Sequence, residues 1–369
     1  MEPVGEGDRF RLEALTERLI YASRMDDAEP WEAMAEAIAF ATTCILEDPD
    51  PLNDRELADG QQYVTRILRA VTESALLDLD FERPAFIPMM EPVRHLGAAG
   101  PDIDYDVAIL VPGGTYRISG HRGAAAYAGI VVYGSSGEDG ASAILASVDI
   151  EELASAGGSF SYDIDHPDAA RVIVRQYFHD RDAQPRGSWT IERTDIHVSG
   201  RESPAPPHPA IVAHQIANAA SMLRWNAQLN RLWTPERRNH PHEFVRQDAD
   251  DIVAAIPNPD VTYSFTWWRL ADDEALEVDV VPPATRYWAV QLCDRWFQCY
   301  PQRRSNLNDR QVEVRPDGSV RIVLAATDPG SSNWLDTGGH RTGVVFFRWL
   351  HAEPEQLPTC RVVPVAELG

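Results

Sequence analysis

The chain has 369 residues, of which 44% are hydrophobic and 24% are charged, and this is typical of globular proteins with more than one domain. Its formal net charge of -24 argues against binding to nucleic acid or to anionic membranes, because phosphate groups would be repelled. The sequence contains arginine but no lysine, which excludes Schiff-base chemistry such as pyridoxal-phosphate catalysis.

Helices are predicted near the N-terminus. Hydrophobic residues recur at helical spacing over residues 10–20 and again over residues 31–45, where Pro30 suits a first helical position. A third amphipathic pattern begins near Asp54. We therefore expect an N-terminal helical region over residues 1–95.

Short runs rich in Tyr, Val and Ile follow, separated by Gly, Pro and Asp, and this pattern is typical of antiparallel strands. The predicted strands of this part span residues 105–111, 115–119, 125–133, 159–164, 171–177 and 188–193. Their regular spacing favours a sandwich or barrel over a parallel sheet with crossover helices. Residues 96–203 are expected to form a first β-sandwich domain.

A linker and one helix, together spanning residues 204–256, precede a second group of strands. Four prolines between Pro204 and Pro209 make the linker stiff, and the hydrophobic spacing over residues 211–223 predicts the helix. The second group of predicted strands spans residues 263–270, 275–281, 287–293, 311–314, 319–325 and 343–350. Residues 257–369 are expected to form a second β-sandwich domain.

The two β regions are similar in sequence. Pro-Asp-Ile-Asp-Tyr at residues 101–105 recurs as Pro-Asp-Val-Thr-Tyr at residues 259–263, and residues 116–127 match residues 276–287. The sequence therefore predicts an internal duplication. The expected fold is mainly β, with two related antiparallel β-sandwich domains, accessory N-terminal helices and a linking helix.

The densest group of polar residues is the glycine-rich loop at residues 328–343. Loops held by a rigid sandwich often carry functional groups. His340 is a candidate general acid or base, Asp336 a candidate for orienting it, and Arg341 a candidate for holding a carboxylate or developing negative charge. In the structural alternative the aspartates cap turns, Trp334 fills the core and His340 satisfies backbone groups.

Aromatic and arginine residues are concentrated between residues 267 and 304. On alternating strands they could line an apolar pocket with a few cationic anchors; alternatively, the rings are core and the arginines pair with the many carboxylates. The candidate substrate-binding residues, from this segment and from the glycine-rich loop, are Arg286, Tyr287, Trp288, Trp296, Tyr300, Arg303, Asn333 and Trp334.

No metal or cofactor is expected. The spacing of Asp102, Asp104 and Asp106 matches the first three ligands of a calcium-binding loop, but the glycine of the turn and the bidentate glutamate are missing. His240 and His242 flank a proline without an HExxH motif. The sequence also has no GxSxG nucleophile elbow, no GxxxxGK[ST] loop and no GxGxxG turn after a strand, so nucleotide-dependent chemistry is unsupported.

The four cysteines, Cys44, Cys293, Cys299 and Cys360, are scattered without a CxxC pair. We expect buried, reduced thiols, and neither a zinc knuckle nor a disulfide framework. The N-terminus has no basic segment followed by an apolar stretch, and the longest nearly apolar run, residues 124–133, is too short to span a bilayer. A cytoplasmic location is therefore expected.

Several segments of the C-terminal half carry a resemblance to a known family. They are Pro257-Asn258-Pro259-Asp260, Arg286-Tyr287-Trp288, Asp328-Pro329-Gly330, residues 333–337 and residues 346–349. Residues 257–352 thereby resemble the bacterial domain of unknown function 1214, and the earlier copy is similar to the first half of two-sandwich proteins of the 1254/1214 type. The resemblance implies two jelly-roll or sandwich domains with accessory helices, often assembled as homo-oligomers. It implies no activity.

We expect a cofactor-independent enzyme that applies acid-base chemistry to a small, largely apolar or aromatic metabolite bound in the C-terminal sandwich. An isomerase, a lyase or hydratase, and a hydrolase are equally compatible with this expectation. Two alternatives belong to other classes of protein: a non-catalytic small-molecule binding protein, and an oligomer-forming interaction module. The expected partners are a small molecule and further copies of the chain, and neither nucleic acid nor a membrane.

Overall fold

The structure is a computed structural model that describes residues 29–75, 80–90, 96–136, 142–196, 208–247, 257–300 and 303–368. The chain divides into two compact units. One comprises Met1–Asp78 and Gly200–Gln228, and the other comprises Leu79–Ser199 and Leu229–Gly369. The helix predicted over residues 10–20 lies outside the described residues.

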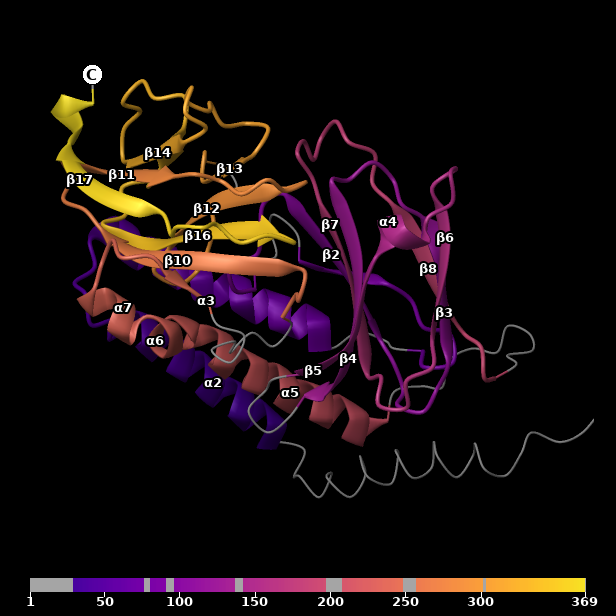
Figure 1. Ribbon diagram of the computed structural model, residues 1–369. Coiled ribbons are helices and arrows are strands. Elements are labelled where there is room, and N and C mark those ends of the chain that lie inside the picture. Colours follow the sequence, from indigo (N-terminus) through magenta and orange to yellow (C-terminus); the bar gives the residue numbers. More distant parts are fainter. Residues whose placement is uncertain are drawn as a thin grey trace, which may run out of the picture. The chain divides into compact units, whose positions relative to one another are not determined.

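The first unit contains helices α2 (Glu29–Leu46), α3 (Asp54–Ala75) and α5 (Pro209–Ala227), which pack side by side (Figure 1). Asn53 begins α3 with a reciprocal cap: its side chain accepts from the amide of Glu56 at 2.8 Å, and its amide donates to the Glu56 carboxylate at 3.0 Å. The Tyr63 hydroxyl donates to the carbonyl of Asn226 at 2.7 Å and joins α3 to α5. The helices predicted in these three segments are confirmed.

The second unit begins with a sandwich of two antiparallel sheets. The five-stranded sheet has the order β1 (Ile87–Met90), β2 (Ile103–Ile109), β7 (Arg171–Tyr177), β4 (Tyr127–Ser136) and β5 (Ser142–Asp149). The three-stranded sheet has the order β6 (Ser159–Ile164), β3 (Tyr116–His121) and β8 (Ser188–Arg193), and the short helix α4 (Ile150–Leu153) follows β5. Between the sheets lie Ile118, Ile130, Val132, Ile164, Val172 and Val174.

A second sandwich follows in the same unit. Its larger sheet has the order β13 (Asn306–Asn308), β12 (Trp288–Asp294), β16 (Thr342–Leu350), β10 (Val261–Arg269) and β9 (Val245–Arg246). Its smaller sheet has the order β15 (Trp334–Asp336), β14 (Val320–Ala325), β11 (Glu274–Val280) and β17 (Thr359–Pro364). Helices α6 (Leu229–Trp233) and α7 (Pro235–Asn239) precede it, and a short 3-10 helix (Val365–Glu367) follows.

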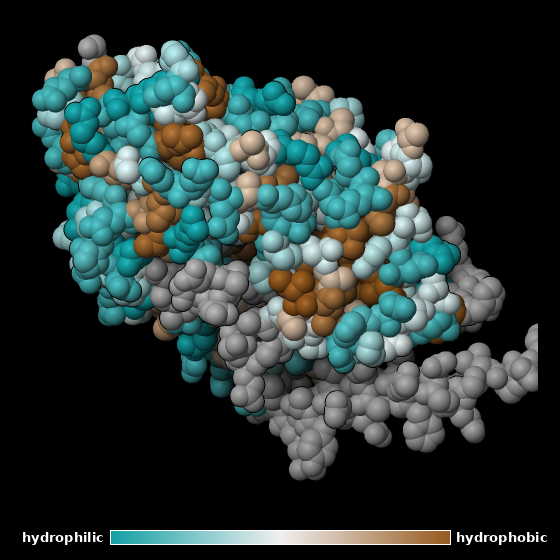
Figure 2. Space-filling view, in the orientation of Figure 1, coloured by the Kyte–Doolittle hydropathy of each residue, from teal (hydrophilic) through white to brown (hydrophobic). Residues whose placement is uncertain are grey.

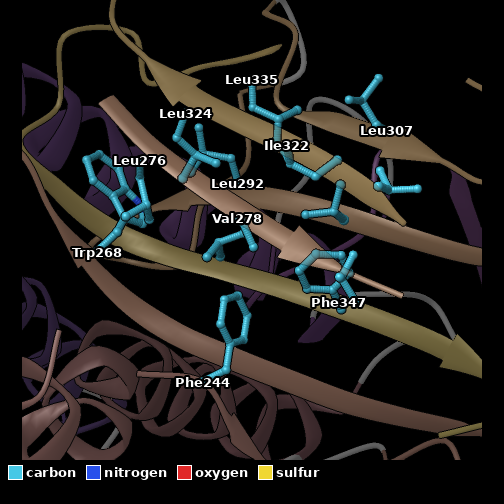
Figure 3. Close-up of a cluster of buried hydrophobic side chains, with 14 of the residues drawn as sticks. Phe244, Trp268, Leu276, Val278, Leu292, Leu307, Ile322, Leu324, Leu335 and Phe347 are labelled. Atoms are coloured by element: carbon cyan, nitrogen blue, oxygen red, sulfur yellow. The ribbon is translucent and has the colours of Figure 1, made fainter. Parts of the chain in front are cut away.

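The core of the second sandwich is filled by large side chains from both sheets (Figure 3). It includes Phe244, Trp268, Leu276, Val278, Leu292, Leu307, Ile322, Leu324, Leu335 and Phe347. Leu276 of β11 lies directly opposite Leu324 of β14, and both are inaccessible to solvent. Such cross-strand pairs, interdigitated with the facing sheet, are the main source of stability in a sandwich.

The two sandwiches share one strand order. The sequence β1-β2-β7-β4-β5 in the first corresponds to β9-β10-β16-β12-β13 in the second, and β6-β3-β8 corresponds to β14-β11-β17. The register agrees as well, since Tyr105 lies opposite Arg175 and Tyr263 lies opposite Arg348. The expected fold class, two related antiparallel sandwiches with accessory helices, is confirmed.

Polar contacts connect the two sandwiches. The Tyr127 hydroxyl donates to the Asp260 carboxylate at 2.6 Å, and the Tyr133 hydroxyl donates to the Pro257 carbonyl at 2.5 Å. The Asp102 carboxylate accepts hydrogen bonds from the side-chain amides of Asn306 and Asn308 at 2.7 and 2.8 Å. Burial raises the pKa of Asp102, and these hydrogen bonds offset part of that effect.

Some short segments differ from the prediction. The strand predicted over residues 311–314 is wrong, because the backbone there forms turns and an irregular stretch between β13 and β14. Val314 is 53% exposed, so the alternation of valines in this segment does not mark a buried face. The strands β1, β5, β9, β13, β15 and β17 were not predicted.

Hydrophilic residues cover most of the face shown in Figure 2, and hydrophobic residues form small separate patches on it. This distribution accords with the strongly negative formal charge. No helix within the described ranges is both long enough and apolar enough to cross a membrane.

Leu276→Ala should destabilise the second unit by about 2–5 kcal/mol, because it removes a buried side chain and leaves a cavity beside Leu324. The control is Val281→Ala at a position that is 65% exposed, where a change within about 0.5 kcal/mol is expected. Chemical unfolding monitored by tryptophan fluorescence measures both. Equal effects of the two substitutions would contradict the assigned core.

Candidate functional site

The predicted catalytic residues lie on the loop that connects β15 with β16. Gly338 and Gly339 have φ values of 65° and 82°, a left-handed conformation that glycine adopts without steric cost. They reverse the chain directly before His340, whose amide donates to the Thr337 carbonyl at 3.1 Å. His340 is thereby held in a fixed position at the start of β16 and is only 3% exposed.

His340 forms part of the wall of a cleft of about 180 Å³. The cleft is lined by Leu270, Ala271, Asp272, Glu274, Ala326, Thr337, Gly339, His340 and Arg341. A cavity of about 150 Å³ is large enough for benzene, so this cleft has room for a molecule of roughly one ring. It combines apolar side chains with one imidazole and three charged groups.

The charge of His340 acts on a buried carboxyl group, that of Asp294. Asp294, at the end of β12, is 1% exposed. Burial raises the pKa of its carboxyl, while the charge of His340 and hydrogen bonds from Gln298 and Trp296 act in the opposite direction. The Tyr300 ring lies 5.0 Å from the His340 ring, centroid to centroid. His340 therefore lines the cleft and lies within electrostatic reach of an internal acidic group.

A tight turn fixes the Asp294 carboxylate. Its Oδ1 accepts from the amides of Trp296 at 2.8 Å and of Gln298 at 3.0 Å, and its Oδ2 accepts from the Gln298 side chain at 2.8 Å. Within this turn Phe297 has a φ of 64°, which is unfavourable for a non-glycine residue. Such strained residues cluster at functional sites, because the surrounding contacts must compensate the strain.

Asp336 does not take the position predicted for it. Its Oδ2 accepts from Arg303 at 2.7 Å and its Oδ1 accepts from the amide of Gly338 at 2.7 Å. The described hydrogen bonds of Asp336 thus go to Arg303 and to the loop backbone, and not to His340. The carboxyl group on which the charge of His340 acts is that of Asp294.

Arg341 lies at the rim of the cleft and forms a bidentate pair with Asp272. The two bonds, Nε to Oδ1 and Nη2 to Oδ2, measure 2.8 and 2.6 Å. The side chains of Arg341 and Asp272 are 52% and 73% exposed, so water screens the pair. Arg341 can bind a substrate carboxylate only if that carboxylate displaces Asp272.

Two predicted substrate-binding residues serve the fold instead. The Asn333 side chain donates to the carbonyls of Glu313 and Arg321 and accepts from the amide of Glu313. The Trp334 indole donates to the carbonyl of Ala325 at 3.0 Å and packs against a small apolar cluster outside the main core. Neither side chain lines the cleft of His340.

The remaining predicted binding residues are spread over three places. Trp288 belongs to the core of the second sandwich. Arg286 pairs with Asp149, and the Tyr287 hydroxyl donates to Asp102 at 3.5 Å, so both connect the two sandwiches. Trp296 is 1% exposed on the turn of Asp294. The structure therefore brings Tyr300 beside His340 and places Trp296 on the turn of Asp294. Arg303 and Arg341 bond to other carboxylates, those of Asp336 and Asp272.

Asp294 was missed at the sequence level. It directly follows a predicted strand and precedes Arg295 and Trp296, so its position at a strand end beside aromatic residues was the available signal. Its partner His340 lies far along the chain, and the sequence gives no indication that the two converge. In the parts of the chain that the structure describes, no three His, Cys, Asp or Glu side chains converge as a metal-binding cluster.

A model of the family described as "Protein of unknown function (DUF1254)" matches residues 237–362. This segment is similar to the DUF1254 family. It covers most of the second sandwich and the residues just before it, including Asp294 and His340. No curated protein shows significant similarity to the chain. The match agrees with the predicted resemblance to proteins of the 1254/1214 type. The prediction compared residues 257–352 with family 1214, whereas the model that matches this segment is that of DUF1254.

Solved structures are similar to this chain over most of its length. An uncharacterized protein from Burkholderia cenocepacia has 28% identity and a TM-score of 0.84, over 92% of this chain and 98% of that chain. The VPA0106 protein from Vibrio parahaemolyticus has 11% identity and a TM-score of 0.44, over 89% of this chain and 100% of that chain. The similarity to the Burkholderia structure therefore extends beyond the segment that the DUF1254 model matches.

Asp294→Asn should change how stability depends on pH. Because burial raises the folded-state pKa of Asp294 above its ordinary value of 3.8, the protonated carboxyl stabilises the fold at low pH, and this contribution is lost as the pH rises through the folded-state pKa. The asparagine of the variant does not titrate, so the variant does not lose stability in this way. Its stability relative to the wild type should therefore increase as the pH rises from below 3.8 into the range above it.

Thermal unfolding over that pH range measures the difference. Asp317→Asn is the control with the opposite sign, because hydrogen bonds from Ser319 lower the pKa of that exposed carboxyl. Its stability relative to the wild type should decrease as the pH rises. If the curves of unfolding temperature against pH are parallel for the wild type and Asp294→Asn, Asp294 does not titrate as a buried acid.

Proposed function

We propose that the protein is a cofactor-independent enzyme in which His340 transfers a proton to or from a small, largely apolar molecule. The observation that supports this most strongly is that His340 lines the cleft and lies within electrostatic reach of the buried Asp294. A histidine at the wall of a ligand-sized space, with an internal carboxyl group nearby, has the arrangement required of a general acid or base.

In this proposal each group has a defined task. Asp294 positions His340 and favours its charged form after it has accepted a proton, as carboxylates do for catalytic histidines. Leu270, Ala271 and Ala326 provide the apolar wall against which the substrate packs. Arg341 and Asp272 at the rim bind a polar or charged substituent of the substrate.

The proposal covers a class of reactions and not a single one. Isomerisation, hydration or elimination, and hydrolysis all need a proton moved at one substrate atom, and one positioned imidazole serves each of them. A cleft of about 180 Å³ restricts the substrate to a molecule of about one ring or a short chain. The alternative, a non-catalytic binding protein, would use the same cleft without chemistry.

We also infer that the two sandwiches arose by duplication within the gene. The repeated Pro-Asp-x-x-Tyr segments at the starts of β2 and β10 and the common strand order support this inference. The resemblance of residues 257–352 to the domain of unknown function 1214 is in keeping with such a two-sandwich origin. The cleft of His340 belongs to the second copy.

The proposed function is tested by proton NMR in deuterated water with a panel of single-ring and short-chain carbonyl compounds, unsaturated acids and esters. Isomerisation, hydration and hydrolysis all change the spectrum, so one assay covers the class. The wild type should convert at least one compound, and His340→Gln should reduce the rate by about 10²–10⁴-fold. His240→Gln is the matched control, because that side chain is exposed at 54%.

Conversion at an equal rate by wild type and His340→Gln would overturn the proposal. Saturable binding of a compound by the wild type without any conversion across the panel would favour the non-catalytic alternative. Thermal unfolding of His340→Gln shows whether the variant keeps its fold, so that a lost activity is assigned to chemistry.

A further inference from the structure

Two cysteines lie directly opposite each other at the base of the Asp294 turn, which comprises residues 294–298. Cys293, on β12, forms an isolated antiparallel bridge with Cys299, which follows the turn. The Asp294 amide donates to the Gln298 carbonyl at 2.9 Å and flanks this bridge. Cys293 and Cys299 are therefore a non-hydrogen-bonded pair, in which the two Cα atoms are usually about 4.5 Å apart. A disulfide needs Cα atoms about 4.4–6.8 Å apart, so the backbone here suits one.

The two sulfur atoms gather around one carbonyl group, that of Ala99. The Cys299 thiol donates to this carbonyl at 3.3 Å. The Gln291 side chain donates to the same carbonyl at 3.0 Å and to the Cys293 sulfur at 3.2 Å. Because Gln291 and Cys293 are two positions apart on β12, both point to the face of this strand that lies outside the sandwich core. The two thiols thus lie on the same side of the pair, as a bond between them requires.

The ring that such a disulfide closes contains the whole Asp294 turn. The Asp294 carboxylate accepts hydrogen bonds from the amides of Trp296 and Gln298 and from the Gln298 side chain, and all of these groups lie between the two cysteines. Neither cysteine lines the cleft of His340. The charge of His340 acts on the Asp294 carboxyl, however, so a change in this turn alters the electrostatic environment of His340.

We propose that Cys293 and Cys299 form a reversible disulfide when the protein is exposed to hydrogen peroxide, and that this bond regulates the His340 site by locking the Asp294 turn. Both cysteines are thiols in this structure. A disulfide at the base of a turn restrains the turn from opening, and this fixes the carboxylate that the turn holds. The regulatory part rests on the proposed function of His340, whereas the disulfide itself does not.

The oxidation takes place in two steps. One thiolate attacks a peroxide oxygen and the O–O bond breaks, which gives a sulfenic acid and a hydroxide ion. The proton released by that thiol converts the hydroxide into water. The second thiol then attacks the sulfenic sulfur, so that the S–S bond forms and the S–O bond breaks with release of a second water molecule. In total the two thiols lose two electrons and two protons, and hydrogen peroxide takes them up.

Burial sets the rate of this oxidation. Cys293 is inaccessible to solvent and Cys299 is 1% exposed. Burial also raises the pKa of the Cys293 thiol well above its ordinary value. Since the thiolate is the reacting form, the disulfide should form slowly, and faster as the pH rises. The pair therefore responds to sustained exposure to the oxidant.

Peptide mapping of the folded, full-length protein tests the disulfide. Trypsin cleaves after Arg295, between the two cysteines, so the bond appears as a linked pair of the peptides 287–295 and 296–303. After prolonged treatment with hydrogen peroxide this linked pair should appear, and dithiothreitol should remove it. Absence of the linked pair, or sulfinic acid at either cysteine in its place, would overturn the proposal. A disulfide from Cys293 to Cys44 or Cys360 would also contradict it.

Hydrogen exchange and NMR then test the regulation. In the oxidised wild type the amides of Trp296 and Gln298 should exchange at least about 10-fold more slowly than in the reduced protein, because the disulfide opposes opening of the turn. The imidazole resonances of His340, assigned by their absence in His340→Gln, should shift. Unchanged exchange or unchanged His340 resonances in a protein that carries the linked pair would overturn the regulation.

Two variants provide the controls. Cys299→Ser, whose hydroxyl replaces the thiol as donor to Ala99, should show neither change after the same treatment, and thermal unfolding checks its fold. Cys360→Ser, on β17, should behave like the wild type. Loss of the linked pair in Cys360→Ser would contradict the assignment. None of these measurements needs a substrate, so they remain decisive if the panel of compounds shows no conversion.

Discussion

The structure depends on one constraint, which is that the central strands of the second sandwich are buried on both faces. Every residue of β12 and every residue of β16 is buried. One face of these strands fills the sandwich core with residues such as Leu292 and Phe347, and the other face carries Gln291, Arg348 and other side chains outside that core. A strand of this kind cannot place a polar group on a solvated face, so each polar side chain has to find its partner inside the protein.

This constraint explains why the chemistry-bearing residues gather on the outer face and at the ends of β12 and β16. Asp294 ends β12, and its carboxylate is satisfied by the turn that follows. His340 precedes β16 and lines the cleft, and its charge acts on the Asp294 carboxyl. Arg348 lies farther along β16 and bonds to Gln291 on β12. In each case the low dielectric constant of the protein interior strengthens the electrostatic interactions of the charged side chain. This strengthening is the physical reason why buried charged groups can bind ligands or react.

Much of the fold could be predicted from the sequence, and the site only in part. The strands β6, β7 and β8 have the predicted bounds because alternating Tyr, Val and Ile between turn residues is a strong local signal. Short strands such as β15 are defined by pairing with distant segments and carry no such signal. Likewise, His340 was found from its loop, but the buried carboxyl on which its charge acts was not. Asp336 precedes His340 by four positions, yet its carboxylate bonds to Arg303 and to the amide of Gly338. The pairing of β12 with β16 places Asp294 opposite Gly343, three positions after His340, and no local pattern in the sequence encodes this pairing.

The central claim is that the cleft beside His340 is a binding site for a small molecule, and crystallographic screening with single-ring fragments tests it most directly. The account predicts that fragments gather in the cleft lined by Leu270, Thr337 and His340, with a polar atom within hydrogen-bonding distance of the imidazole. Fragments bound elsewhere on the second unit, with the cleft unoccupied in every crystal, would contradict it.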